Sequence, residues 1–176
     1  MYQIIKQILK TGIKTEGPPQ ADDALRVEIQ NLQEQILRHV GRALTIRCVD
    51  AGSCNACELE IQALNNAYYN IGGLGINFVA SPRHADMLLV TGPVSRHMEI
   101  ALKRTYDATP DPKLVVAVGD CGCNGGIFAE SYASCGRVSN VIPVDVAIPG
   151  CPPTPTAILQ GILTAVSRRP STDTTP

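Results

Sequence analysis

From residue 44 onward, short β-rich runs alternate with helical stretches, which is the pattern of βαβ units within one domain. The runs MLLVT and LVVAV are apolar at nearly every position, as is typical of strands that carry helices on both faces. The pattern therefore predicts a flavodoxin-like, three-layer α/β/α fold with a mainly parallel sheet. It places strands at residues 44–49, 76–80, 87–91, 114–118 and 141–146, and helices at residues 57–69, 95–107, 126–134 and 153–167.

The two ends of the chain differ from this domain, which is expected to span residues 44–168. Residues 1–43 are expected to form an N-terminal helical docking arm, and the polar, proline-rich residues 169–176 a disordered tail. The arm begins with a short basic amphipathic helix and continues, after a Gly-Pro-Pro break, with a second helical seam. That seam packs either on the chain's own core or on a partner subunit; its residues are Leu25, Ile29, Leu32, Ile36 and Val40.

The composition argues against several classes of protein. A formal net charge of −1 argues against a nucleic-acid-binding protein, whose contact surface is basic. No apolar run approaches the roughly 20 residues of a transmembrane helix, and the first residues lack the apolar region of a secretory signal. Seven cysteines cannot all pair in disulfides. Metal binding in a reducing, cytoplasmic compartment is therefore the expected use of the thiols.

Four cysteines follow shortly after predicted strands, in three separate loops. Cys54 and Cys57 lie in AGSCNAC, Cys121 lies in GDCGCNGG and Cys151 lies in PGCPPTP. Loops at the carboxyl ends of parallel strands share one edge of the sheet, where open α/β domains hold their ligands. Four thiolates are the ligand set of a [4Fe–4S] cluster, and the surrounding glycines let backbone pass close to it. The sequence therefore predicts one such cluster at this edge.

Two other uses of these cysteines stay open. The CxxC spacing of Cys54 and Cys57 also fits a thioredoxin-like redox pair, although that reading leaves Cys121 and Cys151 unexplained. A Cys₄ zinc site tolerates the same ligands, with Cys121 and Cys123 as its second pair. A domain with a complete α/β core has little need of such a zinc ion. In each case, backbone N–H groups at the start of the predicted helix are expected to stabilise the thiolates.

The remaining candidate residues carry weaker signals. Cys48 lies inside a predicted strand and Cys135 lies beyond a predicted helix, and both are expected to be structural. Cys123 is an alternative ligand to Cys121, which is preferred because it directly follows the Gly-Asp pair at the strand end. Glu60 is expected to relay protons near the cluster or to face a partner, and a solvated or capping role stays open for both Glu58 and Glu60. The sequence has no nucleophile–base pair and no phosphate-binding loop, so we expect no complete active site on this chain.

The ordered motifs together resemble one protein family, the small subunits of [NiFe] hydrogenases and the related cluster-bearing subunit of respiratory complex I. The resemblance spans about residues 44–165 and is greatest to membrane-bound, energy-converting hydrogenases of the formate hydrogenlyase type. It implies a proximal [4Fe–4S] cluster bound by Cys54, Cys57, Cys121 and Cys151, with Cys123 as a spare thiol. The segments that carry it are RCVDAGSCNACELEI, SPRHADMLLVTGPV, GDCGCNGGIF and VIPVDVAIPGCPPTP.

The resemblance also implies a function and partners. The chain is expected to pass electrons between a ferredoxin-like polyferredoxin subunit and the nickel–iron site of a hydrogenase large subunit. Membrane-embedded subunits complete such a complex, so the chain is expected to be peripheral on the cytoplasmic side of the inner membrane. The spacing in CNAC resembles the hydrogenase branch, because the complex I branch has two adjacent cysteines at this point. A complex I-like subunit that passes electrons to quinone is the alternative.

Overall fold

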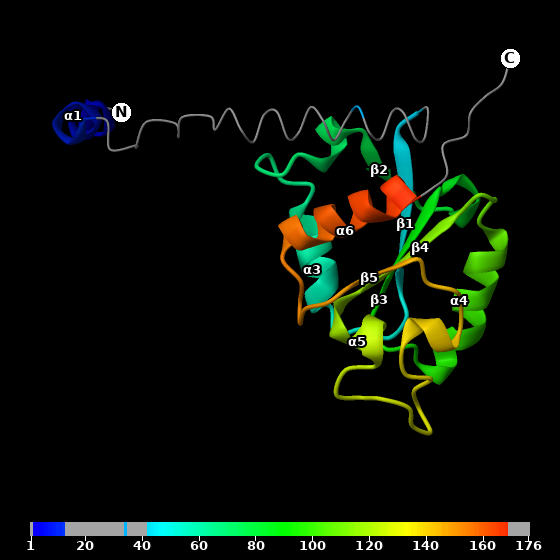
Figure 1. The fold of residues 1–176 in the computed structure, drawn as a ribbon. Helices are drawn as coiled ribbons and strands as arrows, with labels where there is room; N and C mark the ends of the chain where they lie inside the picture. The colour runs from blue at the N-terminus through cyan, green and yellow to red at the C-terminus, as the bar shows by residue number, and fades with distance from the viewer. Residues whose placement is uncertain (1, 13–33, 35–41, 169–176) are drawn as a thin grey trace, which may run out of the picture.

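The computed structural model describes residues 2–12, 34 and 42–168, in which five strands form one parallel sheet. The strand order is β2-β1-β3-β4-β5, with helices on both faces (Figure 1). This architecture confirms the predicted flavodoxin-like α/β fold. The strands are β1 (Leu44–Asp50), β2 (Ile76–Phe78), β3 (Met87–Thr91), β4 (Leu114–Val118) and β5 (Val146–Ile148).

Helices cover the two faces of the sheet and bury two apolar cores. α3 (Ala56–Ala63) and α6 (Pro155–Arg168) lie on one face, and α4 (Arg96–Ala108) lies on the other (Figure 1). Neighbouring side chains of β3 alternate between the cores, so that Leu89 packs with α3 and α6 while Leu88 packs with α4. The other helical elements are α1 (Tyr2–Thr11), α5 (Gly119–Asn124), and the short 3₁₀ helices η1 (Ile71–Leu74), η2 (Pro82–His84) and η3 (Val138–Asn140).

Four of the strands end level with one another. The last residue of β1, Asp50, is paired with Thr91 at the end of β3, and Thr91 is paired with Val118 at the end of β4. Val118 is paired in turn with Ile148, the last residue of β5. The segments after β1, β4 and β5 therefore start at the same edge of the sheet, as the sequence predicts. They contain the four candidate ligands, with Cys57 in the first turn of α3 and Cys121 in α5.

The prediction of a helix at residues 126–134 is wrong. The helix after β4 is α5, and Gly125 and Gly126 end it with φ angles of +93° and +54°. The segment that follows pairs with the loop after β3 instead: the N–H of Cys135 donates to the carbonyl of Val94 at 2.7 Å. This long-range pairing outweighs the local helical pattern of the segment.

Two further boundaries differ from the prediction. The strand expected at 141–146 begins only at Val146, because the Asp145 carboxylate takes a place beside β4 and accepts the N–H of Val115 at 2.7 Å. The helix expected at 57–69 ends at Ala63, and the side chain of Asn66 turns the chain beyond it. The other expected strands and helices are confirmed within a few residues.

The amphipathic helix predicted at the N-terminus is present as α1, and it buries no residue. The second seam of the arm and the tail at residues 169–176 lie outside the described residues. Among the helices that are described, none combines the length and the apolar character needed to cross a bilayer.

Candidate metal centre

The loop that leads to Cys54 is fixed by hydrogen bonds at the end of β1. Oδ1 of Asp50 accepts the N–H groups of Gly52 and Ser53, each at 2.8 Å. The loop after β3 approaches closely from the side, since a Cβ on Gly92, where φ is +75°, would lie only 2.5 Å from the nitrogen of Ser53. Only glycine fits there, so this contact holds the first cysteine loop against its neighbour.

The first two cysteines flank the start of α3. The helix begins at Ala56, which places Cys57 in its first turn, as the sequence predicts. Asn55 lies between the two cysteines with a left-handed φ of 70°, so the chain turns sharply there. The Cys54 side chain is exposed and that of Cys57 is half-buried.

The loops after β4 and β5 are tied to one another directly in front of their cysteines. The N–H of Asp120 donates to the carbonyl of Gly150 at 2.8 Å, and Oδ1 of Asp120 accepts the N–H of Gly150 at 2.8 Å. Cys121 and Cys151 are the next residues on the two loops. This reciprocal pair of hydrogen bonds therefore sets the spacing between the third and fourth cysteines.

Two glycines make room for the cysteine sulfurs. At Gly119, where φ is +82°, an added Cβ would lie 2.6 Å from Sγ of Cys57 and 3.4 Å from the carbonyl oxygen of Gly150. At Gly126, where φ is +54°, an added Cβ would lie 2.8 Å from Sγ of Cys121. Gly119 is thus the point at which all three cysteine-bearing loops meet.

Two of the four thiols, those of Cys57 and Cys121, have pKa values raised by burial and by the neighbouring thiols. Burial raises the pKa of Cys57 to about 12, with smaller increases caused by Glu58 and by the other three thiols. Burial also raises the pKa of Cys121, and Cys151 and Cys54 raise it further. The net pKa of Cys57 is raised in the chain alone, and the stabilisation of the thiolates by the helix start stays a prediction. Bound cations would have to offset the repulsion among the thiolates, so binding a metal group here would release protons.

The donor set fits a cluster better than a lone ion. Among the described residues, no three His, Cys, Asp or Glu side chains lie close enough together to hold a single metal ion. A [4Fe–4S] cluster does not require that closeness, because each thiolate binds a different iron at a corner of the cube. The four candidate thiols converge from three loops beside glycine backbone, which suits such a group.

The remaining cysteines are turned into the domain. Sγ of Cys123 donates to the carbonyl of Ile148 at 3.4 Å, and burial raises its pKa to about 11. Burial likewise raises the pKa of Cys48 to about 11, and Cys48 packs against the core. Cys135 is buried, and its thiol donates to Oε2 of Glu99 at 3.4 Å. These contacts agree with the structural roles predicted for Cys48 and Cys135, and with a spare thiol at Cys123.

Glu58 is a residue of this site whose contacts sequence reasoning missed. Its Oε1 accepts the hydroxyl of Ser53 at 2.7 Å and also contacts the hydroxyl of Thr91. Its Oε2 is buried and has no hydrogen-bond partner among the residues that the structure describes. The available signal was the polar Thr91 at the end of an otherwise apolar buried strand. Glu60 is half-buried on the same helix, and its relay role stays a prediction.

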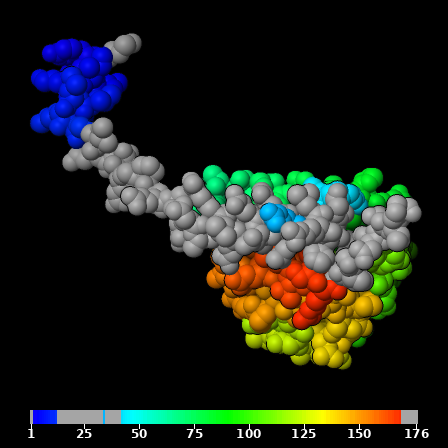
Figure 2. Space-filling view, turned by 45° about the horizontal axis from the view of Figure 1, so that its top comes forward, coloured from blue at the N-terminus to red at the C-terminus, as the bar shows by residue number. Residues whose placement is uncertain are grey.

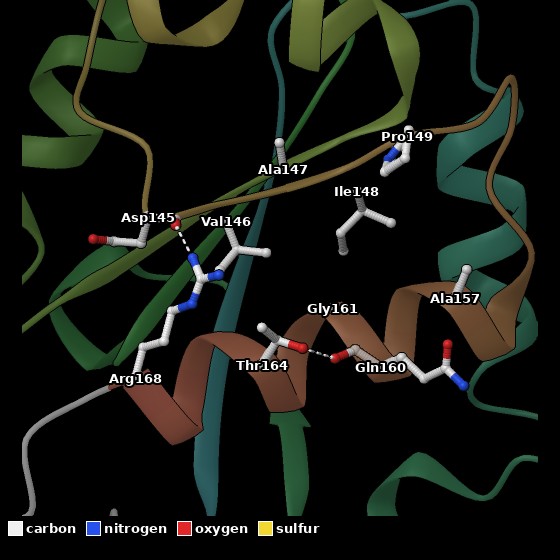
Figure 3. Close-up of a pocket in the computed structure, with 10 residues that line it drawn as sticks. All are labelled: Asp145, Val146, Ala147, Ile148, Pro149, Ala157, Gln160, Gly161, Thr164 and Arg168. Carbon is white, nitrogen blue, oxygen red and sulfur yellow. Dashed lines mark hydrogen bonds between the residues drawn. The ribbon is translucent and has the colours of Figure 1, made fainter.

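Two hollows of the domain lie apart from the four candidate ligands. A hollow of about 400 Å³ lies between β5 and α6, and none of its ten lining residues is a cysteine (Figure 3). The Arg168 guanidinium closes one end of it by donating to the carbonyl of Asp145 at 3.2 Å. A smaller hollow of about 290 Å³ lies beside Glu58 and is also lined by Arg47 and Cys48.

Comparison with known proteins places this geometry in a family. Residues 54–165 match the family described as NADH ubiquinone oxidoreductase, 20 Kd subunit. The probable membrane-bound hydrogenase subunit mbhJ of Pyrococcus furiosus is 42% identical over 143 residues, covering 81% of this chain and 86% of that protein. Formate hydrogenlyase subunit 7 of Escherichia coli is 43% identical over 138 residues, covering 78% of this chain and 54% of that protein.

The similarity extends to quinone-linked proteins and to solved structures. An NADH-quinone oxidoreductase subunit of Desulfovibrio desulfuricans is 44% identical over 123 residues, covering 70% of this chain and 66% of that protein. A chain of the membrane-bound sulfane sulfur reductase, an archaeal respiratory membrane complex, matches with a TM-score of 0.63 at 33% identity. That match covers 78% of this chain and 73% of the other. A chain of an NAD⁺-reducing [NiFe]-hydrogenase shares the fold, with a TM-score of 0.57 at 19% identity and 74% and 94% of the two chains covered.

Proposed function

Because the chain belongs to the family of the 20 Kd subunit of NADH ubiquinone oxidoreductase, we propose that it is the electron-transfer small subunit of a membrane-associated [NiFe] hydrogenase. Its relatives are subunits of hydrogenase and complex I-type assemblies, so the chain is a subunit of an oxidoreductase complex. The observation that carries the finer proposal is the meeting of three cysteine-bearing loops at Gly119, on one edge of the sheet.

The proposed cofactor is one proximal [4Fe–4S] cluster, held by Cys54, Cys57, Cys121 and Cys151. When bound, such a cluster would supply a one-electron carrier. The residues of this chain would supply its position and its surroundings. Half-buried Cys57 and Cys121 would hold its inner side, the exposed Cys54 and Cys151 its outer side, and the glycine backbone would approach its sulfurs. No residue of the chain is proposed to act on a substrate.

The proposed partners would cover the apolar surface beside the cysteines. The segment after α5 exposes Ile127, Phe128 and Tyr132, with exposed fractions of 93%, 53% and 98%. On α3, Leu59 follows Cys57 by two residues and is 57% exposed. Exposed large apolar side chains on segments that adjoin the cysteines suit a protein contact surface. We assign this surface to the large subunit, which carries the nickel–iron site, with a ferredoxin-like polyferredoxin subunit as electron partner.

The rest of the proposed assembly is membrane-embedded. In this proposal the chain is peripheral, on the cytoplasmic side of the inner membrane, and residues 1–43 act as a second docking arm. The relatives named membrane-bound hydrogenase and formate hydrogenlyase support an assembly of this kind.

A complex I-like role in passing electrons to quinone is the second candidate, because the NADH-quinone oxidoreductase relative is as similar in sequence as the hydrogenase relatives are. The two-residue spacing between Cys54 and Cys57 supports the hydrogenase branch, which this spacing resembles.

The cluster assignment is tested on the full chain purified without oxygen. We expect four irons and four acid-labile sulfides per chain, and a visible absorption band that bleaches on reduction. Cys151→Ala should lose the iron and sulfide while keeping its far-ultraviolet circular dichroism, because both apolar cores lie away from that loop. Cys135→Ala is the matched control and should keep the cluster. A Cys151→Ala chain with full iron and sulfide contradicts the ligand assignment.

The choice between hydrogenase and quinone module is tested on the native complex, isolated through this chain. We expect nickel in the complex and H₂-dependent reduction of an artificial electron acceptor. A complex that lacks nickel and reduces quinone instead supports the second candidate and overturns the first, whatever the cluster content of this chain.

A further inference from the structure

Helix α1 has one apolar side and one polar side. At about 100° per residue, its five large apolar side chains fall on an arc of about 160°. All five are exposed, and Ile8 and Leu9 have exposed fractions of 63% and 79%. The apolar residues are Tyr2, Ile4, Ile5, Ile8 and Leu9.

The polar side of α1 carries positive charge and no negative charge. Its charged residues are Lys6 and Lys10, which lie one turn apart, about 40° and about 80° beyond the Tyr2 edge of the apolar arc. Gln3, Gln7 and Thr11 complete the polar side. Lysines beside an apolar arc extend their charged ends toward solvent while their stems cover apolar surface. An amphipathic helix with this charge pattern is complementary to a negatively charged surface.

No described element of the chain covers the apolar side. α1 has no buried residue, and in the space-filling view it projects away from the α/β domain (Figure 2). A helix of ten residues is marginal in water by itself, so its apolar side needs another surface. Its apolar arc is far wider than the two-position seam of a coiled coil, and it lacks the paired charges that select a partner helix. A broad apolar arc with lysines beyond one edge suits the flat interface of a bilayer.

We infer that α1 lies in the surface of an anionic membrane, with its apolar side toward the acyl chains and Lys6 and Lys10 at the lipid phosphates. The binding is electrostatic in part, so it requires anionic lipid and weakens with salt. One short helix gives only marginal membrane affinity, so α1 orients the chain on a membrane that the rest of the complex also contacts. This inference is independent of the cluster and of the reaction.

The test is sedimentation of the full chain with vesicles of phosphatidylcholine, or of phosphatidylcholine mixed with phosphatidylglycerol. We expect salt-sensitive binding to the anionic vesicles and none to the neutral ones. Replacing both lysines by glutamine should weaken binding by about 30-fold at low salt, which corresponds to about 1 kcal/mol for each lysine. Ile5→Gln with Ile8→Gln should abolish binding without a change in charge.

The matched control is Ile100→Gln on α4, since Ile100 has an exposed fraction of 62%, close to that of Ile8. The control should bind as the unaltered chain does. Unchanged vesicle binding by the Ile5, Ile8 double variant, or equal binding to neutral vesicles at high salt, overturns the inference. A stable dimer that disappears in the double variant also overturns it, because α1 would then pair with a second copy of itself.

Discussion

The close approach of Gly119 to Sγ of Cys57 leads to a specific prediction for Gly119→Ala. The new methyl carbon would lie 2.6 Å from Sγ of Cys57, whereas ordinary contact begins at 3.4 Å. The sulfur or its loop must therefore move by about 0.8 Å. Metal–ligand distances tolerate only about 0.2 Å. We expect this substitution to reduce cluster binding severely.

Gly119→Ala also strains the backbone, and the effect of this strain on stability must be separated from the effect of the contact with Cys57. At a φ of +82°, an alanine costs about 1–2 kcal/mol in any surroundings. Gly75, at the end of η1, has a φ of +80° and nothing within 4 Å of an added Cβ. Gly75→Ala therefore imposes the same backbone strain without the contact on Cys57, and it serves as the matched control.

The assay combines cofactor content with thermal unfolding. Both variants should lose about 1–2 kcal/mol, which lowers the melting temperature by about 2–8 °C in a chain of this size. Only Gly119→Ala should lose iron and acid-labile sulfide. The reasoning is refuted if Gly119→Ala keeps the full iron and sulfide content, or if Gly75→Ala loses as much of them.

Three further predictions concern the surroundings of the site. The Glu58 carboxylate disfavours negative charge on the neighbouring Cys57 thiol. Glu58→Gln should therefore make the midpoint potential of the cluster more positive in a redox titration, and Glu60→Gln, the control, should not. Cys48 and Cys123 have pKa values raised to about 11. In the cluster-free chain, iodoacetamide should therefore leave both thiols unmodified at about pH 8.5, the ordinary pKa of cysteine, and should modify them as the pH approaches 11. Modification of either thiol at about pH 8.5, detected by mass spectrometry, would contradict the raised pKa values. Deletion of residues 1–43 should reduce recovery of the complex by affinity purification more than it reduces iron content; equal recovery would remove the docking role.

Much of the fold was predictable because the buried strands are apolar at nearly every position. MLLVT and LVVAV have both faces covered, and the structure places β3 and β4 at the predicted boundaries. The carboxyl edge followed from the parallel order of the strands. The predicted site residues could be placed on this edge because each cysteine lies a few residues after a strand or in the first turn of the next helix.

The errors arise where contacts across the fold outweigh local pattern. Residues 126–134 have a helical composition, yet the segment is held by its pairing to Val94 and by two glycines in left-handed conformation. The start of β5 depends on the side chain of Asp145, which takes over a hydrogen bond to β4. The role of Glu58 depends on Thr91, which is 33 residues away in the sequence. Apart from the polar Thr91 at the end of an apolar buried strand, these contacts have no signal in the local sequence.

The similarity to known proteins also bears on the choice between the hydrogenase and the quinone-linked function. Relatives from hydrogenase and from quinone-linked complexes are almost equally similar to this chain, at 42–44% identity. If the chain only carries electrons, its partner determines the substrate. The residues that distinguish the two reactions should then lie on the surface that meets the partner. In the proposed assembly that surface includes Ile127, Phe128 and Tyr132, so we predict that replacing all three with serine abolishes association with the proposed large subunit and leaves the cluster intact.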